Sequence, residues 1–600
     1  MAKSNDTDLK GLLKGINEGK YQLPDFQRSW VWDDTRIVKL LESLFSGFPM
    51  GAVMNLEYGG DELHFKYRLF TGVNNEFERV VPSGLILDGQ QRLTSLYQSL
   101  YCSAPVKTCL PTSRDKEIER YYYLDMRKMI DPNTDVIDAI ISIPKDKKVK
   151  SDIGRKIELD LSTPEQEYQE CFFPINIIFS PTAPMKWMMG FYKTHNNEVE
   201  YTQMWELFMT NVIEPIQNYK IPVIQLEKDT KKEAVCQIFE NVNTGGEPLT
   251  VFELVTAIYA AGEYNLRDDW DAIQSRFAKE LKVNLLKKLQ PHYFLQAMSL
   301  LVSYQYYLQN DTAVTCKKRD ILKLPLEDYR ENHDALVQGF IDAAKFVSHR
   351  GIYQTNNIPY EGQLIPLAAI FAFDNTHDKK LNMPNGKDML ARWYWCGVFG
   401  EKYGSATETR FANDVQFFFK WLDGDKQPDT VQNANFNAMR LLSLTTRNSA
   451  AYKGIMALIT MDEPLDFMTE QKIGVATYID ENTDIHHIYP QAQCEGKYPY
   501  NRWNSIINKT PIYASTNRSI GGRLPSEYLQ TMRNKGLTDE KICEILISHK
   551  VNPQLLESDD FYAYTKDRAS QILNRIEKAM GKAVDGRTSE DVLNEFGGPI

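Results

Sequence analysis

The sequence predicts a multidomain α+β protein, and three observations support this fold class. The chain has 600 residues, whereas a single hydrophobic core stops growing at roughly 250 to 300 residues. Apolar β-rich runs alternate with helical segments up to about residue 265, and beyond it apolar residues recur at helical spacing. With 42% hydrophobic and 25% charged residues, the composition is that of a folded globular protein. We therefore expect two or three domains.

Residues 1–265 are expected to form an α/β domain. Short helical segments separate β-rich runs at 85–87, 121–124, 172–179 and 221–224. Residues 266–440 are expected to form an α-helical connector, because apolar side chains follow helical spacing at Trp270, Ile273, Phe277 and Leu281, and again at Phe411, Val415, Phe418 and Phe419. A polar, turn-rich stretch at 423–429 interrupts the helices.

Residues 441–580 are expected to form a C-terminal domain, in which helix surrounds a short strand. Ile485, Ile488 and Tyr489 favour that strand, and Pro490 ends it. The remaining residues, 581–600, are acidic and contain glycines, so we expect a mobile tail. No internal repeat is visible.

Charge and cysteine content restrict the classes of partner. The net charge of -11 is repelled by nucleic acid, so any DNA binding must come from local basic surface. Two basic clusters, 145–150 and 317–319, are interpreted as solvated loops. The eight cysteines are scattered without the spacing of a structural zinc site. With neither a signal peptide nor an apolar stretch of the ~20 residues that span a bilayer, we expect a cytoplasmic protein without a membrane partner.

A cluster of histidines and asparagines near the C-terminus indicates phosphodiester chemistry. The segment Asp484-Ile485-His486-His487-Ile488-Tyr489-Pro490 is followed by Asn508 and, nine residues later (517 minus 508), by Asn517-Arg518. Side chains alternate along a strand, so Asp484 and His486 are expected on one face and His487 on the other. Hydrolysis at neutral pH needs a base, for which histidine is suited, and a cation held by oxygen or nitrogen ligands. The alternative is two ordinary histidines with turn-capping asparagines.

This pattern resembles the HNH (ββα-metal, His-Me finger) nucleases over roughly 40 residues. The resemblance implies His487 as the general base and His486, Asn517 and Asp484 as metal-binding residues for Mg²⁺ or Mn²⁺. It also implies that Asn508 staples the turn, and we group Asn508 with the catalytic residues. Arg518 is a candidate catalytic residue because a guanidinium binds phosphate, and the alternative is an ordinary surface arginine. The loop between His487 and Asn508 is longer than in compact motifs of this class.

Three segments of the N-terminal domain carry polar residues at turns. Asp88-Gly89-Gln90-Gln91-Arg92 follows a short strand and opens a helix, where free backbone N–H groups favour anions, although many such turns bind nothing. Pro24-Asp25-Phe26-Gln27-Arg28 precedes a helix beginning near Asp33, and its neighbouring tryptophans either belong to the core or stack on a base. Asn243-Thr244-Gly245-Gly246 precedes Thr250 and Glu253, which form a capping box.

Together these segments resemble the ParB-like N-terminal domain of the GmrSD class of modification-dependent (type IV) restriction endonucleases. The resemblance implies that this domain binds and hydrolyses a nucleoside triphosphate (GTP, ATP or another NTP) and senses modified DNA. Carried over residue by residue, the nucleotide-binding set is Gln27, Arg28, Asp88, Gly89, Gln90, Gln91, Arg92, Asn243, Gly245 and Gly246. No Walker A sequence occurs, so a P-loop mechanism is not implied.

The sequence therefore predicts a phage-defence endonuclease that cuts modified phage DNA under the control of a nucleotide. Two alternatives stay open: a nucleotide-dependent DNA-binding regulator with an inactive HNH fold, and a non-specific DNA or RNA nuclease toxin. A homodimer is attractive, because one HNH site cuts one strand and a double-strand break needs two cuts.

Overall fold

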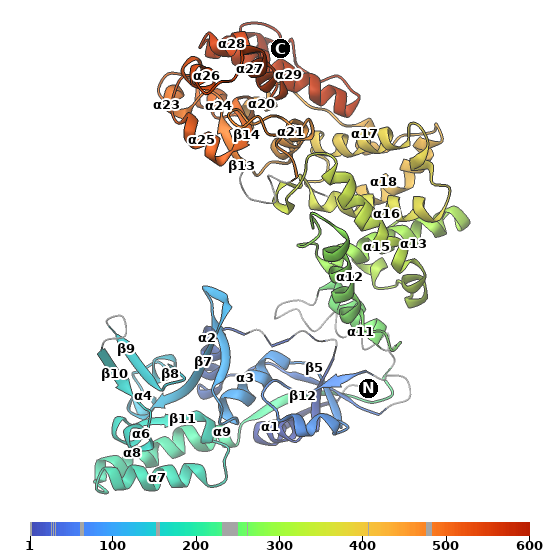
Figure 1. Ribbon diagram of the computed structural model, residues 1–600. Coiled ribbons are helices and arrows are strands. Elements are labelled where there is room, and N and C mark those ends of the chain that lie inside the picture. The colour runs from blue at the N-terminus through green and yellow to red at the C-terminus, as the bar shows by residue number, and fades with distance from the viewer. Residues whose placement is uncertain are drawn as a thin grey trace. The chain divides into compact units, whose positions relative to one another are not determined.

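The computed structural model describes residues 3–25, 27, 29–30, 32–59, 65–151, 156–230, 250–260, 262–405, 407–475 and 483–600. The chain divides into two compact units, Met1–Leu266 and Arg267–Ile600. The first is an α+β unit with a mixed sheet, and the second is largely helical, which confirms the predicted class at this level (Figure 1). Within the described ranges, no helix is both long enough and apolar enough to cross a membrane.

A six-stranded mixed sheet organises the first unit, in the order β1-β12-β3-β5-β2-β4. Parallel pairs (β12 with β3, β2 with β5) alternate with antiparallel ones (β1 with β12, β3 with β5, β2 with β4). The strands are β1 (Lys3–Asp8), β2 (Tyr21–Pro24), β3 (Val53–Glu57), β4 (Tyr67–Arg68), β5 (Gly84–Asp88) and β12 (Lys220–Leu226).

A second, four-stranded antiparallel sheet and a hairpin complete the strands of this unit. They comprise β6 (Val106–Leu110), β7 (Ser113–Asp125), β8 (Ile140–Pro144) and β11 (Phe172–Pro174), with the hairpin β9 (Lys148–Ser151) and β10 (Lys156–Asp160). The helices are α1 (Leu9–Asn17), α2 (Asp34–Phe45), α3 (Gln90–Leu100), α4 (Met126–Ile130), α5 (Val136–Ala139), α6 (Pro164–Glu170), α7 (Ala183–Thr194), α8 (Val199–Phe208), α9 (Glu214–Gln217) and α11 (Val251–Ala260).

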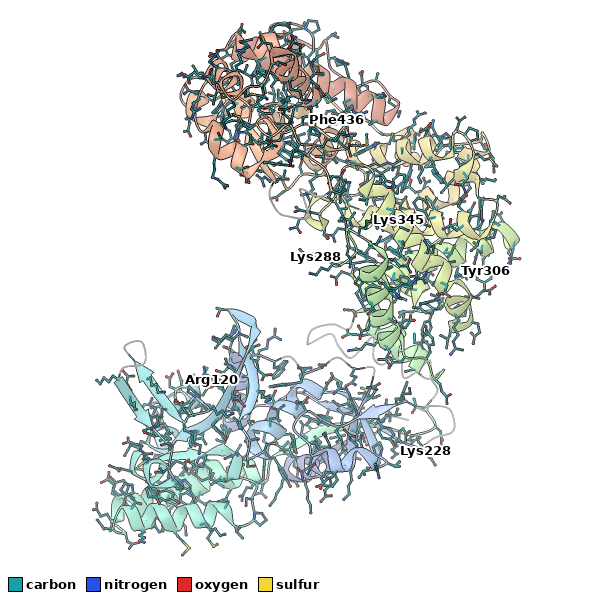
Figure 2. All side chains as sticks on the ribbon, viewed as in Figure 1. Arg120, Lys228, Lys288, Tyr306, Lys345 and Phe436 are labelled. Atoms are coloured by element: carbon teal, nitrogen blue, oxygen red, sulfur yellow. The ribbon has the colours of Figure 1, made fainter. Side chains whose placement is uncertain are left out.

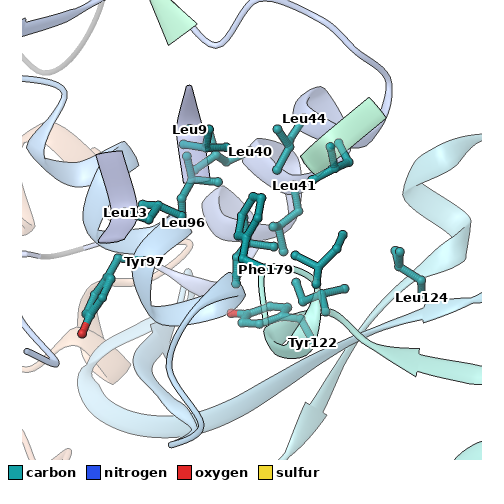
Figure 3. Packing of buried hydrophobic residues seen from close by; sticks show 14 of the residues in the cluster. Leu9, Leu13, Leu40, Leu41, Leu44, Leu96, Tyr97, Tyr122, Leu124 and Phe179 are labelled. Carbon is teal, nitrogen blue, oxygen red and sulfur yellow. The ribbon is translucent and has the colours of Figure 1, made fainter. Parts of the chain in front are cut away.

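The core of the first unit joins the helices to both sheets. Leu9 and Leu13 of α1, Leu41 of α2 and Leu96 of α3 are fully buried, and Phe179 packs among them (Figure 3). Burial of each such side chain contributes about 1.5 to 3 kcal/mol. The core therefore holds α3, and with it the turn after β5, in a fixed position.

The run 172–179, expected to be β-rich, forms a strand only at its start. Strand β11 ends at Pro174, and a 3₁₀ turn follows over Ile175–Ile177. Ile175 and Ile178 are both fully buried, three residues apart, which is helical spacing. Packing against the core therefore selects a turn over continued strand.

The second unit begins with a helical array. Its members are α12 (Leu266–Glu280), α13 (Pro291–Asn310), α14 (Lys318–Ile321), α15 (Leu326–Ser348), α16 (Leu364–Thr376), α17 (Gly386–Phe399), α18 (Thr407–Leu422), α19 (Asp429–Gln432), α20 (Arg440–Ser443) and α21 (Ala450–Met461). Aromatic contacts hold this array together. Phe436, labelled in Figure 2, packs edge-on against Phe399 with ring centroids 5.8 Å apart.

The C-terminal half of this unit surrounds one strand pair with short helices. The elements are β13 (Thr483–His487), α23 (Gln491–Cys494), α24 (Tyr500–Trp503), β14 (Lys509–Tyr513), α25 (Ala514–Ile520), α26 (Pro525–Asn534), α27 (Asp539–Ser548), α28 (Pro553–Glu557), α29 (Phe561–Met580) and α30 (Glu590–Phe596). Asp462 after α21 forms ion pairs with Lys550 and with Arg575 of α29, so the two halves are tied by charge as well as by packing.

The tail after Gly581, for which the sequence predicted mobility, is packed. Val592 and Phe596 of α30 are buried, and the guanidinium of Arg502 donates a hydrogen bond to the carbonyl of Glu595. Arg502 also lies over the ring of Phe596, 4.5 Å from its centroid. The two buried apolar residues of α30 are four apart, and the helix contacts Arg502 of α24, which composition alone does not reveal.

Candidate active site

Strands β13 and β14 and helix α25 form a strand–strand–helix unit (orange in Figure 1). The strands pair antiparallel, with His486 opposite Thr510 and His487 opposite Lys509. Helix α25 starts directly after β14, at Ala514. Neighbouring side chains on a strand point to opposite faces, so His486 and His487 have different surroundings.

His486 lies on the face that α25 covers. Its Nδ1 is 2.8 Å from Asn517 Oδ1, and Asn517 Nδ2 donates to Asp484 Oδ2 at 3.2 Å. His486 is 4% exposed and its Nε2 is buried without a hydrogen-bond partner among the described residues. Burial lowers the pKa of His486 to about 4, so the ring is neutral at pH 7. The structure thus joins the three predicted metal-binding residues in one chain of hydrogen bonds.

The chemistry of these three side chains fits a divalent cation. A carboxylate oxygen, an amide oxygen and a neutral imidazole nitrogen are ligands that Mg²⁺ or Mn²⁺ accepts, with water filling the remaining positions. Because the Oδ1 of Asn517 only accepts, Nδ1 of His486 carries the proton, and the buried, unpartnered Nε2 is the ring nitrogen whose lone pair could bind the cation. The described residues contain no group of three or more His, Cys, Asp or Glu side chains that could hold a metal. Asp484 and His486 alone supply two side chains of these types, so binding of a cation here would need the amide oxygen of Asn517 as the third ligand.

His487 lies on the opposite face and makes a different contact. Its Nε2 is 2.9 Å from Asn504 Oδ1, and Asn504 Nδ2 donates to the hydroxyl of Tyr500 at 2.7 Å. Because an amide oxygen only accepts, Nε2 carries the proton and the Nδ1 lone pair is left available as a base. Burial, followed by the positive charges of Lys509 and Arg447, lowers the pKa of His487.

Asn508 is fully buried and bonds to the backbone on both sides of the loop that separates the strands. Its Oδ1 accepts from Tyr489 N at 2.8 Å, and its Nδ2 donates to the carbonyls of Tyr489 and Trp503 at 2.8 and 2.9 Å. This is the stapling arrangement that the resemblance implied. Because its amide is used in this way, Asn508 positions the loop rather than touching a substrate, so its grouping with the catalytic residues needs correcting.

Two further buried residues support the unit and were not identified from sequence. Asp466 is fully buried and accepts from Tyr513 N at 2.8 Å and Thr516 Oγ1 at 2.6 Å, which joins β14 to α25. Arg568 of α29 is also fully buried and donates to the carbonyls of Ile507 and Lys509, on either side of Asn508. Arg518, by contrast, is exposed on α25 next to Asn517.

In the N-terminal unit, the predicted turn joins β5 to α3. Gly89 adopts φ 93°, and a Cβ there would lie 3.0 Å from Val53 Cγ2, so glycine is required. Its N-cap residue, Gly89, has no side chain with which to cap the first turn of α3. Gln90 is buried and Gln91 donates from Nε2 to Ser29 O at 3.1 Å. The predicted turn is therefore a helix N-terminus whose first residues, Gly89 and Gln90, are buried.

Gln27 and Arg92 have structural contacts in this region. Gln27 Nε2 donates to the carbonyls of Ile86 and Leu87 at 2.8 and 2.9 Å, while its buried Oε1 has no partner among the described residues. The guanidinium of Arg92 donates to the carbonyl of Ala52 at 2.8 Å and to Asp88 Oδ2 at 3.1 Å. These bonds hold the start of β3 against α3. Arg28, Asn243, Gly245 and Gly246 lie outside the described residues.

Residues 9–260 match the family described as GmrSD restriction endonuclease, N-terminal domain. The first unit contains a GmrSD N-terminal domain. Over 613 aligned positions, the chain is also 27% identical to an uncharacterized protein of Methanocaldococcus jannaschii, covering 96% of this chain and 97% of that protein. This match confirms the predicted resemblance to a GmrSD N-terminal domain over residues 9–260. The HNH resemblance of the C-terminal segment stays a prediction.

Proposed function

We propose that the chain is a metal-dependent DNA endonuclease whose cutting is controlled by nucleotide binding in its GmrSD N-terminal domain. The observation that carries the proposal is the strand–strand–helix unit, in which His487 has an available Nδ1 while Asp484, His486 and Asn517 are joined on the other face. The match of residues 9–260 to a domain of restriction endonucleases supports DNA as the substrate of the strand–strand–helix unit.

In this proposal His487 accepts the proton of the attacking water. Asn504 holds the ring so that Nδ1 points away from the loop, and the lowered pKa keeps the ring neutral at pH 7. Asp484, His486 and Asn517 would hold the divalent cation. Once bound, the cation would stabilise negative charge on the scissile phosphate and the leaving oxygen. Exposed Arg518 adds a positive charge for a neighbouring phosphate.

The GmrSD N-terminal domain supplies control in this proposal. Its nucleotide site is the turn between β5 and α3, where the partly exposed carboxylate of Asp88 lies beside the start of the helix. Binding of nucleoside triphosphate and modified DNA would shift the chain from a state in which the second unit does not cut toward one in which it cuts. Type IV restriction of modified phage DNA is the biological role that we infer.

One experiment tests the activity and separates its rivals. Purified protein is incubated with Mg²⁺ or Mn²⁺, with and without ATP or GTP, on unmodified DNA, cytosine-modified DNA, phosphorothioate DNA and RNA. We expect metal-dependent cutting of modified DNA that changes with nucleotide and is lost in His487→Ala. Cutting of none of these substrates would favour a non-cutting regulator, and equal cutting of RNA and all DNAs would favour a non-specific nuclease.

A further inference from the structure

Three positively charged side chains gather on the His487 side of the strand pair. Arg447 is exposed in the loop before α21, Lys453 is half-buried in the first turn of α21, and Lys509 starts β14 directly opposite His487. Lys509 Nζ lies 5.8 Å from the ring centroid of Tyr452, the residue before Lys453. We call Arg447, Lys453 and Lys509 the cation cluster.

The cation cluster borders a pocket between α21 and β13. Arg447, Tyr452 and Lys453 line one side of it, and Thr483 and Ile485 line the other. Thr483 and Ile485 alternate with Asp484 and His486, so they share a face of β13 with His487. The pocket therefore lies on the same face of β13 as the proposed base, beside residues 483 and 485 of the strand.

Carboxylates do not neutralise this cluster within the described ranges. None of its three cations forms an ion pair there, and Lys453 and Lys509 donate instead to the carbonyls of Ile358 and Thr445, at 3.1 and 2.8 Å. Burial and, after it, the nearby charge of Arg447 lower the pKa of Lys509 to about 8. Glu361 is an acidic group that acts on Lys453, without an ion pair.

The lysine run at 145–150 provides a contrast within the same chain. Lys145, Lys147, Lys148 and Lys150 each pair with a carboxylate, from Glu119, Glu167, Asp160 and Asp146 respectively. Phosphate binding there would first have to break those ion pairs. The cation cluster has no such competition, although its members are dispersed in sequence.

We propose that the cation cluster and its pocket form a seat for the phosphate backbone of the DNA strand that flanks the cut. The seat rests on the proposed nuclease function, and it explains how a chain of net charge -11 could hold a polyanion. The exposed guanidinium of Arg447 contacts a phosphate directly, and Lys453 contacts the same or the next one. Buried Lys509 adds attraction without contact.

The test compares two double variants of the full-length protein that carry the same net charge. Arg447→Gln/Lys453→Gln removes two cations from the seat. Arg319→Gln/Lys472→Gln removes two exposed cations that pair with Asp320 and Glu463 elsewhere on the second unit. Binding of a fluorescent duplex is measured between 50 and 300 mM salt (roughly the range over which counterion release is resolved), and cutting is measured in parallel.

We expect the seat variant to lower the magnitude of the slope of log K against log salt by about 0.9 if the two cations contact one phosphate and by about 1.8 if they contact two, because each phosphate contact contributes about 0.9. The paired-cation variant should keep the slope of the wild type. Equal slopes for the seat variant and the wild type would overturn the seat, even where the wild type cuts DNA. The seat would also be overturned if the seat variant weakened binding of RNA but not binding of the DNA duplex.

The design separates this proposal from the proposed function. If the wild type neither binds nor cuts DNA, the nuclease function and the seat fail together; if it cuts DNA and the seat variant behaves like it, only the seat fails. Arg447→Glu provides a second variant at an exposed position where misfolding is not a concern. It should weaken DNA binding more than Arg447→Gln, and equal binding by the two would contradict direct phosphate contact.

Discussion

At the scale of single residues, Asn504 controls how His487 is oriented. The 2.9 Å contact to Nε2 sets which ring nitrogen carries the proton. Asn504→Ala should lower the single-turnover cutting rate about 10- to 100-fold, the usual effect of removing an orienting partner. Asn504→Asp keeps an acceptor and should retain more activity. Its added negative charge should raise the pKa of His487.

The pair of Asn504 variants distinguishes orientation from folding. The pH profile of Asn504→Asp should move to higher pH, because the carboxylate favours the imidazolium. A merely structural asparagine would give two variants with reduced stability and an unshifted profile. That result, measured by thermal unfolding beside the rate, would contradict the positioning role.

The wild-type pH profile is a second prediction at this scale. A base must be neutral, so cutting should fall as the pH drops through the pKa of His487. Since burial, Lys509 and Arg447 lower that pKa, the acid limb should lie below the ordinary histidine value of about 6.5. The measurement is the single-turnover rate at saturating metal. A limb centred at or above 6.5 would contradict the assignment of His487 as the neutral base.

Residues that occur in an ordered pattern could be predicted from the sequence, whereas their partners could not. The spacing of His487, Asn508 and Asn517 identified a set that the structure assembles around one strand pair. Asn504 and Asp466 carry no signal of their own, because each acts through a contact 17 or 50 positions away, with His487 and Thr516 respectively. Such contacts depend on the folded path of the chain.

At the scale of elements, Arg568 of α29 holds the turn before β14. It is fully buried and donates to the carbonyls of Ile507 and Lys509, so its removal leaves buried acceptors unsatisfied. Arg568→Met should lower the free energy of unfolding by about 3 kcal/mol and reduce cutting. Lys578→Met, at an exposed position of the same helix, is the control. Equal denaturation midpoints for the two variants would refute this role.

His549 predicts an acid-sensitive packing of β14 against the end of α27. It is fully buried between Thr510 Oγ1 and the carbonyl of Leu465, both 2.7 Å away, and burial lowers its pKa to about 3. The unfolded chain therefore takes up a proton first, below about pH 6.5. The free energy of unfolding should fall as the pH drops from there toward 3. The loss should be roughly 3 kcal/mol over the first two pH units.

The measurement is denaturant unfolding at pH 7 and at pH 4.5. His549→Asn should lose less stability between these two pH values than the wild type, because the titrating group is gone. His349→Asn, at an exposed position, should keep the dependence of the wild type. An unchanged pH dependence in His549→Asn would show that another group is responsible.

At the scale of the whole molecule, periodicity predicted the change from an α+β unit to a helical one, because both signals extend over many turns. Composition failed for the tail, where Val592 and Phe596 are buried and the guanidinium of Arg502 lies over the ring of Phe596. Periodicity failed at 172–179, where burial of Ile175 and Ile178 selects a turn. Short segments are decided by what they pack against.

Control of the second unit by the first is the prediction that concerns the whole chain. Asp88 is partly exposed at the turn between β5 and α3, and its Oδ2 accepts from Arg92. Asp88→Asn keeps an acceptor for Arg92 but removes the charge, so the fold should persist. If this turn is the nucleotide site, hydrolysis of ATP or GTP should fall at least 10-fold (an order-of-magnitude expectation for a group in the reacting site).

The nucleotide response of DNA cutting should disappear in the same variant, while cutting without nucleotide stays as in the wild type. Asp131→Asn, which removes an exposed turn carboxylate of the same unit, is the matched control and should leave both activities unchanged. Loss of hydrolysis with an intact nucleotide response would show that this turn hydrolyses nucleotide but does not control DNA cutting. Unaltered hydrolysis and response in Asp88→Asn would place the nucleotide elsewhere in the chain, because a carboxylate at the reacting phosphates cannot be neutralised without effect.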